Sequence, residues 1–225
     1  MSHYAVAVFS NDCDFESLLA PYNESDKKYF RFEQKPYKEI VADFKKFKKM
    51  NPKWTLDMYI DKFSYVRHNG RWGYMHNPNG FWDWYSIDGK DYLFDPKDGV
   101  SLKDDEYYYR KNDINWYPDN SGCESEAREF WEKFVENGDD EIESFWSRKY
   151  YLERYKTKEQ YIKESCRLIP YAFITPDGVW HAPGRVGFFA TSDETAESAD
   201  QYAYEWDRWI ANEDNPYVSL VDCHI

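Results

Sequence analysis

A segment dense in aromatic residues, from Gly70 to Asp95, restricts the fold more than any other part of the sequence. Its tryptophan, tyrosine and phenylalanine residues are interrupted by Gly, Asn and Pro, a composition typical of short strands and turns and not of helix. The dipeptide Asp88-Gly89 lies between two aromatic runs, and Asp-Gly tolerates the positive φ that a tight two-residue turn needs. We therefore predict a β-hairpin from about Phe81 to Phe94.

Apolar and β-branched runs at both ends of the chain, His3–Ser10 and Tyr217–Ile225, predict the first and last strands of a sheet. Because the two runs are similar, we expect these strands to be adjacent and antiparallel. The fold class is then α+β, an antiparallel or mixed sheet with several amphipathic helices inserted between the strands. No linker divides the chain, so we predict a single domain over residues 1–225 with a largely helical insertion at about 121–166.

Helical periodicity is clear in three further places. Residues 36–50 place apolar side chains on one face and lysines on the other, which predicts an amphipathic basic helix. Asn51-Pro52 has the chemistry of a helix start, so we expect a second helix to begin there. Residues 139–151 continue the apolar pattern of a helix before them, and residues 198–212 predict a last helix.

The charge of the chain is unevenly distributed. The net charge is −13, which disfavours DNA or RNA binding over the whole surface. Residues 27–53 nevertheless carry ten Lys or Arg against three acids, a net +7 that leaves −20 for the rest of the chain. A basic face on an acidic body is typical of a protein that meets a charged partner in one orientation, and the alternative is a merely solvated helix face. The candidate contact residues are Lys45, Lys46, Lys48 and Lys49.

Common cofactor and metal motifs are missing from the sequence. Its four cysteines show no CxxC spacing, and no phosphate loop, GxGxxG, GxSxG or HExxH motif occurs. We therefore expect no cofactor and no metal. The chain also lacks a signal peptide and an apolar run of the ~20 residues that a membrane span requires, so we expect a cytosolic protein with free thiols and no membrane partner.

Three titratable residues would meet if the terminal strands pair as predicted. Asp222 and His224 lie on one face of the last strand, and His3 would lie at the same end of the sheet. Such a cluster could hold a transition metal or perform acid–base catalysis, because a carboxylate orients an imidazole that titrates near neutrality. The alternative is that these are frayed polar residues at the chain ends.

Aromatic side chains of the organising segment are candidates for ligand binding. The rings of Trp72, Trp82, Trp84 and Tyr85 could stack on a nucleic acid base or contact a protein partner. The alternative is a cross-strand aromatic ladder that only stabilises the hairpin.

Three separated motifs carry a family resemblance. The chain opens with Met1-Ser2-His3-Tyr4 before an apolar strand, has NPNGFWDWY at residues 77–85, and closes with VDCHI at residues 221–225. In the same order, MSHFTV, NPNxKWDWYxxGGRW and VDCHI mark a largely uncharacterised protein family of bacteriophages and prophages, which this chain resembles. The sequence departs from that pattern at residues 88–91, where DGKD replaces GGRW. A role of that element in binding an anionic ligand is therefore in doubt here.

The resemblance implies an accessory phage protein in the host cytoplasm. Accessory phage proteins that are acidic and lack catalytic motifs often inhibit host defence, as anti-CRISPR proteins do. We therefore expect a non-catalytic counter-defence protein that binds a bacterial defence protein, with a CRISPR effector as one such target, and that does not bind nucleic acid directly. The alternative is a nucleotide-binding or metal-assisted hydrolytic enzyme that acts on a small nucleotide signal through His3, Asp222 and His224.

Overall fold

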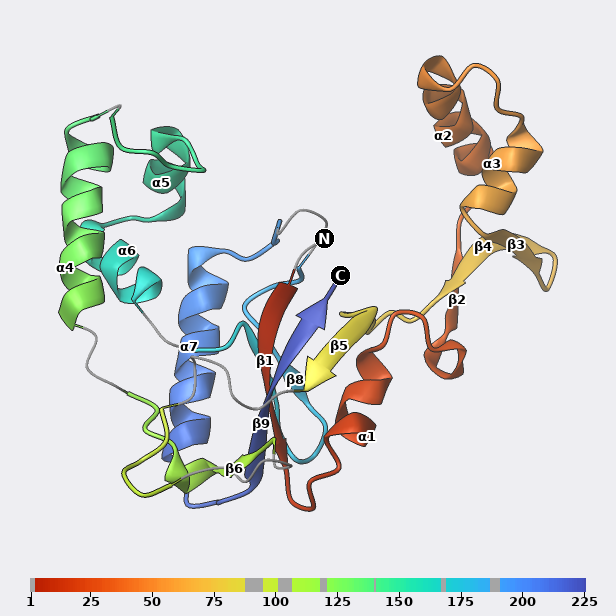
Figure 1. Ribbon diagram of the computed structural model, residues 1–225. Coiled ribbons are helices and arrows are strands. Elements are labelled where there is room, and N and C mark those ends of the chain that lie inside the picture. The colour runs from red at the N-terminus through yellow and green to blue at the C-terminus, as the bar shows by residue number, and fades with distance from the viewer. Residues whose placement is uncertain are drawn as a thin grey trace. The chain divides into compact units, whose positions relative to one another are not determined.

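The computed structural model describes residues 3–87, 95–100, 107–117, 121–139, 141–166, 169–186 and 191–225. These residues form seven α-helices and nine strands, which confirms the α+β class expected from the sequence (Figure 1). The chain divides into two compact units: a small unit, Leu19–Trp84, and a large unit made of Met1–Leu18 and Tyr85–Ile225. The sequence predicts one domain with a helical insertion at about 121–166, and the helices of that segment lie within the large unit.

The large unit is built around strand β1 (His3–Ser10). Strand β9 (Tyr217–His224) pairs antiparallel along its whole length, with His3 opposite His224, so the predicted pairing of the terminal strands is confirmed. Strand β7 (Ala172–Ile174) pairs with β1 in parallel on the other side. The sheet order is β5-β9-β1-β7-β8, where β5 is Trp84–Ile87 and β8 is Trp180–His181, and the short strand β6 (Tyr109–Arg110) also pairs with β9.

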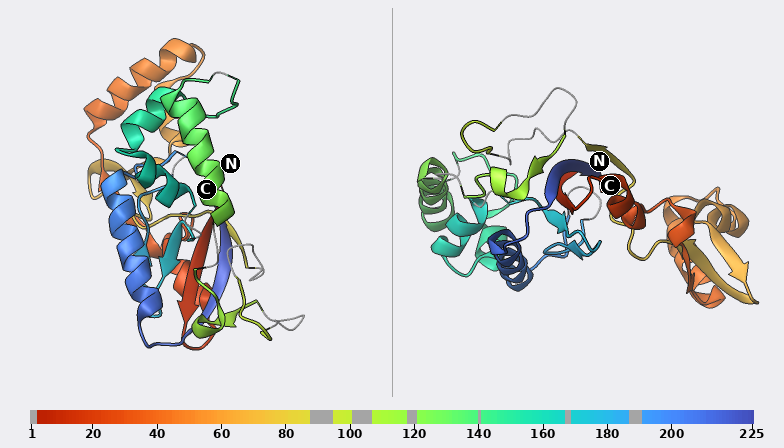
Figure 2. Two further views of the ribbon diagram at one scale, coloured as in Figure 1. Left: turned by 90° about the vertical axis from the view of Figure 1, so that its left-hand side faces the viewer. Right: turned by 90° about the horizontal axis from the view of Figure 1, so that it is seen from below.

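Helix α7 (Ala196–Ala211) covers one face of this sheet (Figure 2). It begins with a capping box in which the Thr195 and Ser198 side chains bond each other's backbone N–H groups. Its apolar side buries Tyr202 and Trp206, which pack on Ala7, Phe9, Phe173, Val218 and Leu220 of the strands. Trp206 is fully buried, so this contact forms the main hydrophobic core of the unit.

A buried lysine closes the C-terminal end of α7. Lys111 begins the 3₁₀ turn Lys111–Asp113 directly after β6 and is fully buried. Its Nζ donates to the carbonyl oxygens of Trp209 (3.2 Å) and Asn212 (2.9 Å) and to Oδ1 of Asn212 (2.5 Å). Because the last carbonyls of a helix have no donor within the helix, this ammonium group satisfies acceptors that would otherwise be buried without partners.

Three helices of the large unit pack against one another. Helix α4 (Ser121–Phe130) continues as a π-helical segment, Trp131–Glu136, and shares a core with α6 (Lys158–Ser165). Between them lies α5 (Arg148–Arg154). The prediction of a helix through residues 139–151 is wrong in its first half. The helix starts only at Arg148, where the Ser147 hydroxyl accepts from the Tyr150 N–H and caps it.

The small unit combines a three-stranded antiparallel sheet with two helices. Strands β2 (Arg31–Gln34), β4 (Arg71–His76) and β3 (Tyr65–His68) lie in that order, and α2 (Tyr37–Met50) and α3 (Leu56–Lys62) contribute to a core of Ile40, Phe44 and Tyr59. Helix α2 confirms the predicted basic helix. The predicted start of the next helix at Asn51-Pro52 is wrong, because Thr55 caps α3 while the Asn51 side chain donates to the Phe47 carbonyl and ends α2.

Two turns decide the strands of the aromatic segment. The hairpin that the structure describes is β3–β4, turned by Asn69 and Gly70 with φ of 49° and 78°. The hairpin predicted at 81–94 is described only in its first part, as β5, since residues 88–94 lie outside the described residues. Near the chain start, Asp14 caps the short helix α1 (Phe15–Leu19) through the Ser17 N–H, as its position indicates.

Candidate functional site

The three residues singled out at the chain termini meet at one end of the sheet. In the β1–β9 register His3 faces His224 and Ala5 faces Asp222, so these side chains share one side of the sheet. Nδ1 of His3 lies 2.9 Å from Oδ2 of Asp222, and the His3 and His224 rings lie 5.1 Å apart at 64°. The cluster that the sequence predicts is therefore present.

Its chemistry is that of an oriented imidazole. A carboxylate on Nδ1 fixes the ring and the tautomer, so proton transfer to or from a ligand would run through Nε2 of His3. The His3 and Asp222 side chains are 53% and 44% exposed, which makes them accessible but leaves their interaction screened by water. Within the described ranges, no group of three or more His, Cys, Asp and Glu side chains could hold a metal ion.

The predicted aromatic binding residues have different surroundings. Trp84 is 55% exposed at the start of β5, and Tyr85 next to it is partly buried, which raises the pKa of its hydroxyl. Trp72 is partly buried and stacks on Tyr37 at 5.4 Å. Trp82 is only 4% exposed, because its backbone bonds to the Tyr22–Glu24 segment. It is a core residue of the small unit and offers no ring surface to a ligand.

The four predicted lysines lie on the C-terminal half of α2, and all are exposed. Lys46 lies 3.8 Å from Asp43, an acid that also pairs with Lys35 at 2.8 Å. Lys48 lies over the ring of Phe44. The small unit as a whole carries 13 Lys or Arg against eight Asp or Glu, a net +5, so the large unit carries −18. The charge asymmetry seen in the sequence therefore follows the division into units.

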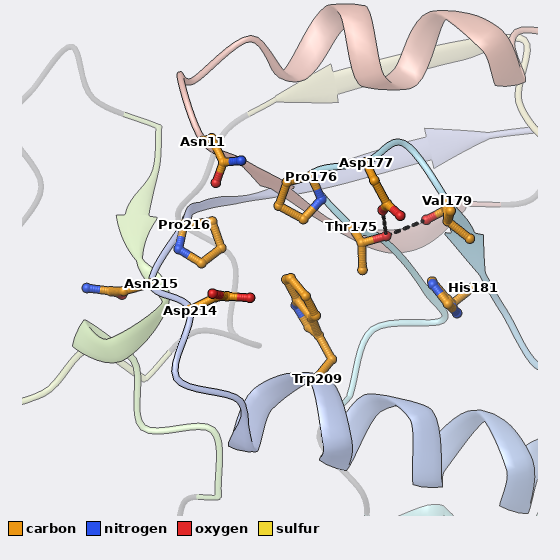
Figure 3. A pocket seen from close by; sticks show the side chains of 10 residues that line it. All are labelled: Asn11, Thr175, Pro176, Asp177, Val179, His181, Trp209, Asp214, Asn215 and Pro216. Carbon is orange, nitrogen blue, oxygen red and sulfur yellow. Dashed lines mark hydrogen bonds between the residues drawn. The ribbon is translucent and has the colours of Figure 1, made fainter.

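A cavity that the sequence did not predict lies where β1 and β7 end (Figure 3). Its volume is about 680 Å³, and its lining comes from the loops after these two parallel strands, from β8 and from the end of α7. Asp177 and Asp214 supply carboxylates to the lining, Trp209 supplies an aromatic ring, and the lining contains no Lys or Arg. Crevices at the carboxyl ends of parallel strands are common ligand sites. The charge of this one disfavours an anionic ligand.

His181 is the reactive group of that cavity. Its Nδ1 lies 3.0 Å from Oε2 of Glu205, and its ring is stacked on Phe173 at 4.4 Å with 6° between the planes. Hydrogen bonds from Gln201 and from His181 lower the pKa of Glu205, which keeps that carboxyl ionised. The molecule therefore holds a second carboxylate-oriented imidazole. Only the Thr175–Gly178 turn before β8 hinted at this placement in the sequence.

Three exposed rings next to α5 form what we call the aromatic patch, Phe145, Trp146 and Tyr150. Phe145 is 88% exposed, the highest value among the large apolar residues, and Trp146 is 41% exposed. The Phe145 and Trp146 rings meet edge to face at 4.8 Å, and Trp146 stacks on Tyr150 at 4.8 Å. The sequence pattern assigned Phe145 and Trp146 to a buried helix face. They are exposed because that segment is not helical.

No family model, curated protein or solved structure matches this chain. Within the described residues, no helix combines the length and the apolar character that crossing a membrane requires.

Proposed function

We propose that this chain is a bacteriophage counter-defence protein that binds a bacterial immune component and blocks it without catalysis. The aromatic patch carries the proposal. Soluble proteins rarely expose contiguous aromatic side chains without a partner, and tryptophan and tyrosine dominate the binding energy of protein interfaces. The phage motifs at the start, centre and end of the chain support the counter-defence setting.

The charge of the large unit indicates what kind of partner fits. Exposed acids, Glu141 and Glu143, adjoin the patch in the sequence, and the large unit carries −18. Such a surface is complementary to a protein that normally binds nucleic acid phosphates, a CRISPR effector being one example. The small unit, with the exposed lysines of α2, then contacts an acidic region of the partner and fixes the orientation of the complex.

The proposal is tested by capturing the tagged protein from a lysate of a bacterium that carries several defence systems, followed by native mass spectrometry. We expect a stoichiometric complex with one immune protein, and a loss of that protein's activity in a purified assay. Because the attraction is partly ionic, the affinity should fall as the salt concentration rises. A partner that binds but keeps its full activity would contradict the inhibitor role.

A second candidate function rests on the 2.9 Å contact between His3 and Asp222 beside His224. An imidazole oriented by a carboxylate is the minimum equipment for general acid–base catalysis, and a small nucleotide signal is the substrate that we consider. Under this candidate the chain removes an immune signal instead of binding an immune protein.

His224→Ala separates the two candidates. The enzymatic candidate predicts that this variant no longer hydrolyses cyclic dinucleotides, measured by chromatography, while its circular dichroism is unchanged. His68→Ala is the matched control, because His68 is an exposed histidine of the small unit. If wild type and His224→Ala show the same turnover, the enzymatic candidate is wrong.

A further inference from the structure

A second cavity, of about 240 Å³, lies between α5, α6 and the first turns of α7. It is smaller than the ~300–1,000 Å³ that drug-sized ligands occupy, so its size suits a single ring system. Its polar wall is an ion cluster of Arg154, Glu164 and Glu194, whose side chains are only 14%, 16% and 22% exposed. Neither candidate function uses this cluster.

The guanidinium group in this wall has an unused donor. Nη2 of Arg154 donates to Glu194 and lies 3.5 Å from Oε2 of Glu164. Nη1 is buried and has no hydrogen-bond partner among the described residues. A buried donor without an acceptor costs about 1–3 kcal/mol, more for a charged group, and such cases in folded proteins call for a missing partner. An acceptor atom placed in the cavity would supply it.

The carboxylates of the same wall have spare acceptor capacity. Oε1 of Glu164 accepts from Gln160 at 2.9 Å, whereas Oε2 of Glu194 accepts no hydrogen bond from the described residues. Burial raises the pKa of both carboxyl groups, and Arg154 opposes this shift. The wall therefore offers one free donor group next to an excess of acceptors.

Aromatic rings form the rest of the lining. Tyr155 and Tyr171 both border the cavity, and the Arg154 guanidinium lies over the Tyr155 ring at 5.3 Å. The Tyr171 hydroxyl is bonded to Ser192 at 2.7 Å, which fixes the orientation of the ring. Rings at this spacing favour a flat, unsaturated ligand that can stack.

We propose that this cavity binds a guanine base, with Nη1 of Arg154 donating to O6 and the Glu194 carboxylate accepting from N1–H and the 2-amino group. Guanine presents one acceptor beside two donors, which matches one free donor group beside surplus acceptors. Adenine presents a single donor beside an acceptor on that edge and would leave an acceptor of the wall unused. Two carboxylates against one guanidinium, with Asp200 also in the lining, reject a phosphate, so a nucleotide would bind with its phosphates outside.

The test is titration of the full-length protein with guanosine, followed by calorimetry. We expect saturable binding with one site, and about tenfold weaker binding of inosine, which lacks the 2-amino group, and of adenosine. Arg154→Lys keeps the positive charge but removes Nη1, and Glu194→Gln removes one acceptor oxygen. Each variant should weaken guanosine binding about tenfold or more.

Arg208→Lys is the matched control, because Arg208 is an exposed arginine of α7 that does not line the cavity, and its affinity for guanosine should equal that of wild type. Thermal melting checks that each variant is folded. If Arg154→Lys unfolds, the comparison of guanosine, inosine and adenosine on wild type still decides. Guanosine that fails to saturate wild type at millimolar concentration, or equal affinity for guanosine and adenosine, overturns the proposal.

Discussion

Replacement of Trp146 by alanine should weaken the complex with the immune partner about 30-fold or more, because truncation of a central interface tryptophan costs about 2 kcal/mol or more. The Trp146 ring lies between the other two rings of the aromatic patch, in contact with Phe145 on one side and Tyr150 on the other. Its removal therefore disrupts the whole patch. The fold should tolerate the change, since the patch residues are exposed and lie outside the core clusters.

Tyr204→Ala is the matched control for this prediction. Tyr204 is a 57% exposed aromatic residue of α7 in the same acidic unit, but it does not belong to the patch. Affinities of the purified partner for the two variants and wild type, measured by biolayer interferometry, should show a loss for Trp146→Ala only. An equal affinity of Trp146→Ala and wild type would remove the patch from the interface and direct attention to the lysines of α2.

Elements that depend on local chemistry could be predicted from the sequence. The basic helix α2 follows from apolar side chains at helical spacing, and the cap of α1 follows from Asp14 before an apolar run. The pairing of β1 with β9 needed only two similar apolar runs. The hairpin at Asn69-Gly70 was also within reach, since Asn-Gly is the strongest short-range hairpin signal. The aromatic residues around Asp88-Gly89 drew the prediction there instead.

The candidate sites differ in the same way. His3, Asp222 and His224 could be brought together on paper because strand pairing has a fixed period of two residues. The cavity beside His181 could not, because its lining comes from four separate segments whose approach depends on tertiary packing. The aromatic patch was missed for a different reason. Periodicity assigned Phe145 to a helix, and only the late start of α5 at Arg148 leaves its ring in solvent.

Lys111→Met should lower the free energy of unfolding of the large unit by about 3 kcal/mol. Methionine fills a similar volume but donates nothing, so the Trp209 and Asn212 carbonyls and the Asn212 side chain lose a buried donor together. These acceptors terminate the helix that covers the main core, and the loss should therefore loosen α7 against the sheet. Urea unfolding followed by tryptophan fluorescence measures the effect, because Trp206 and Trp209 both lie on that helix.

Lys97→Met is the matched control, since Lys97 also donates to a backbone carbonyl, that of Asn112 at 2.6 Å, but is exposed. Water replaces its lost hydrogen bond, so its stability should change by less than about 0.5 kcal/mol. The pH dependence gives an independent check. Burial lowers the pKa of Lys111 from its ordinary value of 10.5, although Asp214 opposes the shift. Between the folded and unfolded pKa values the unfolded chain binds more protons, so wild type gains stability as the pH rises and Lys111→Met does not. The difference between the two proteins should therefore widen toward pH 10.5, and a constant difference would mean that the buried amine titrates as it does in water.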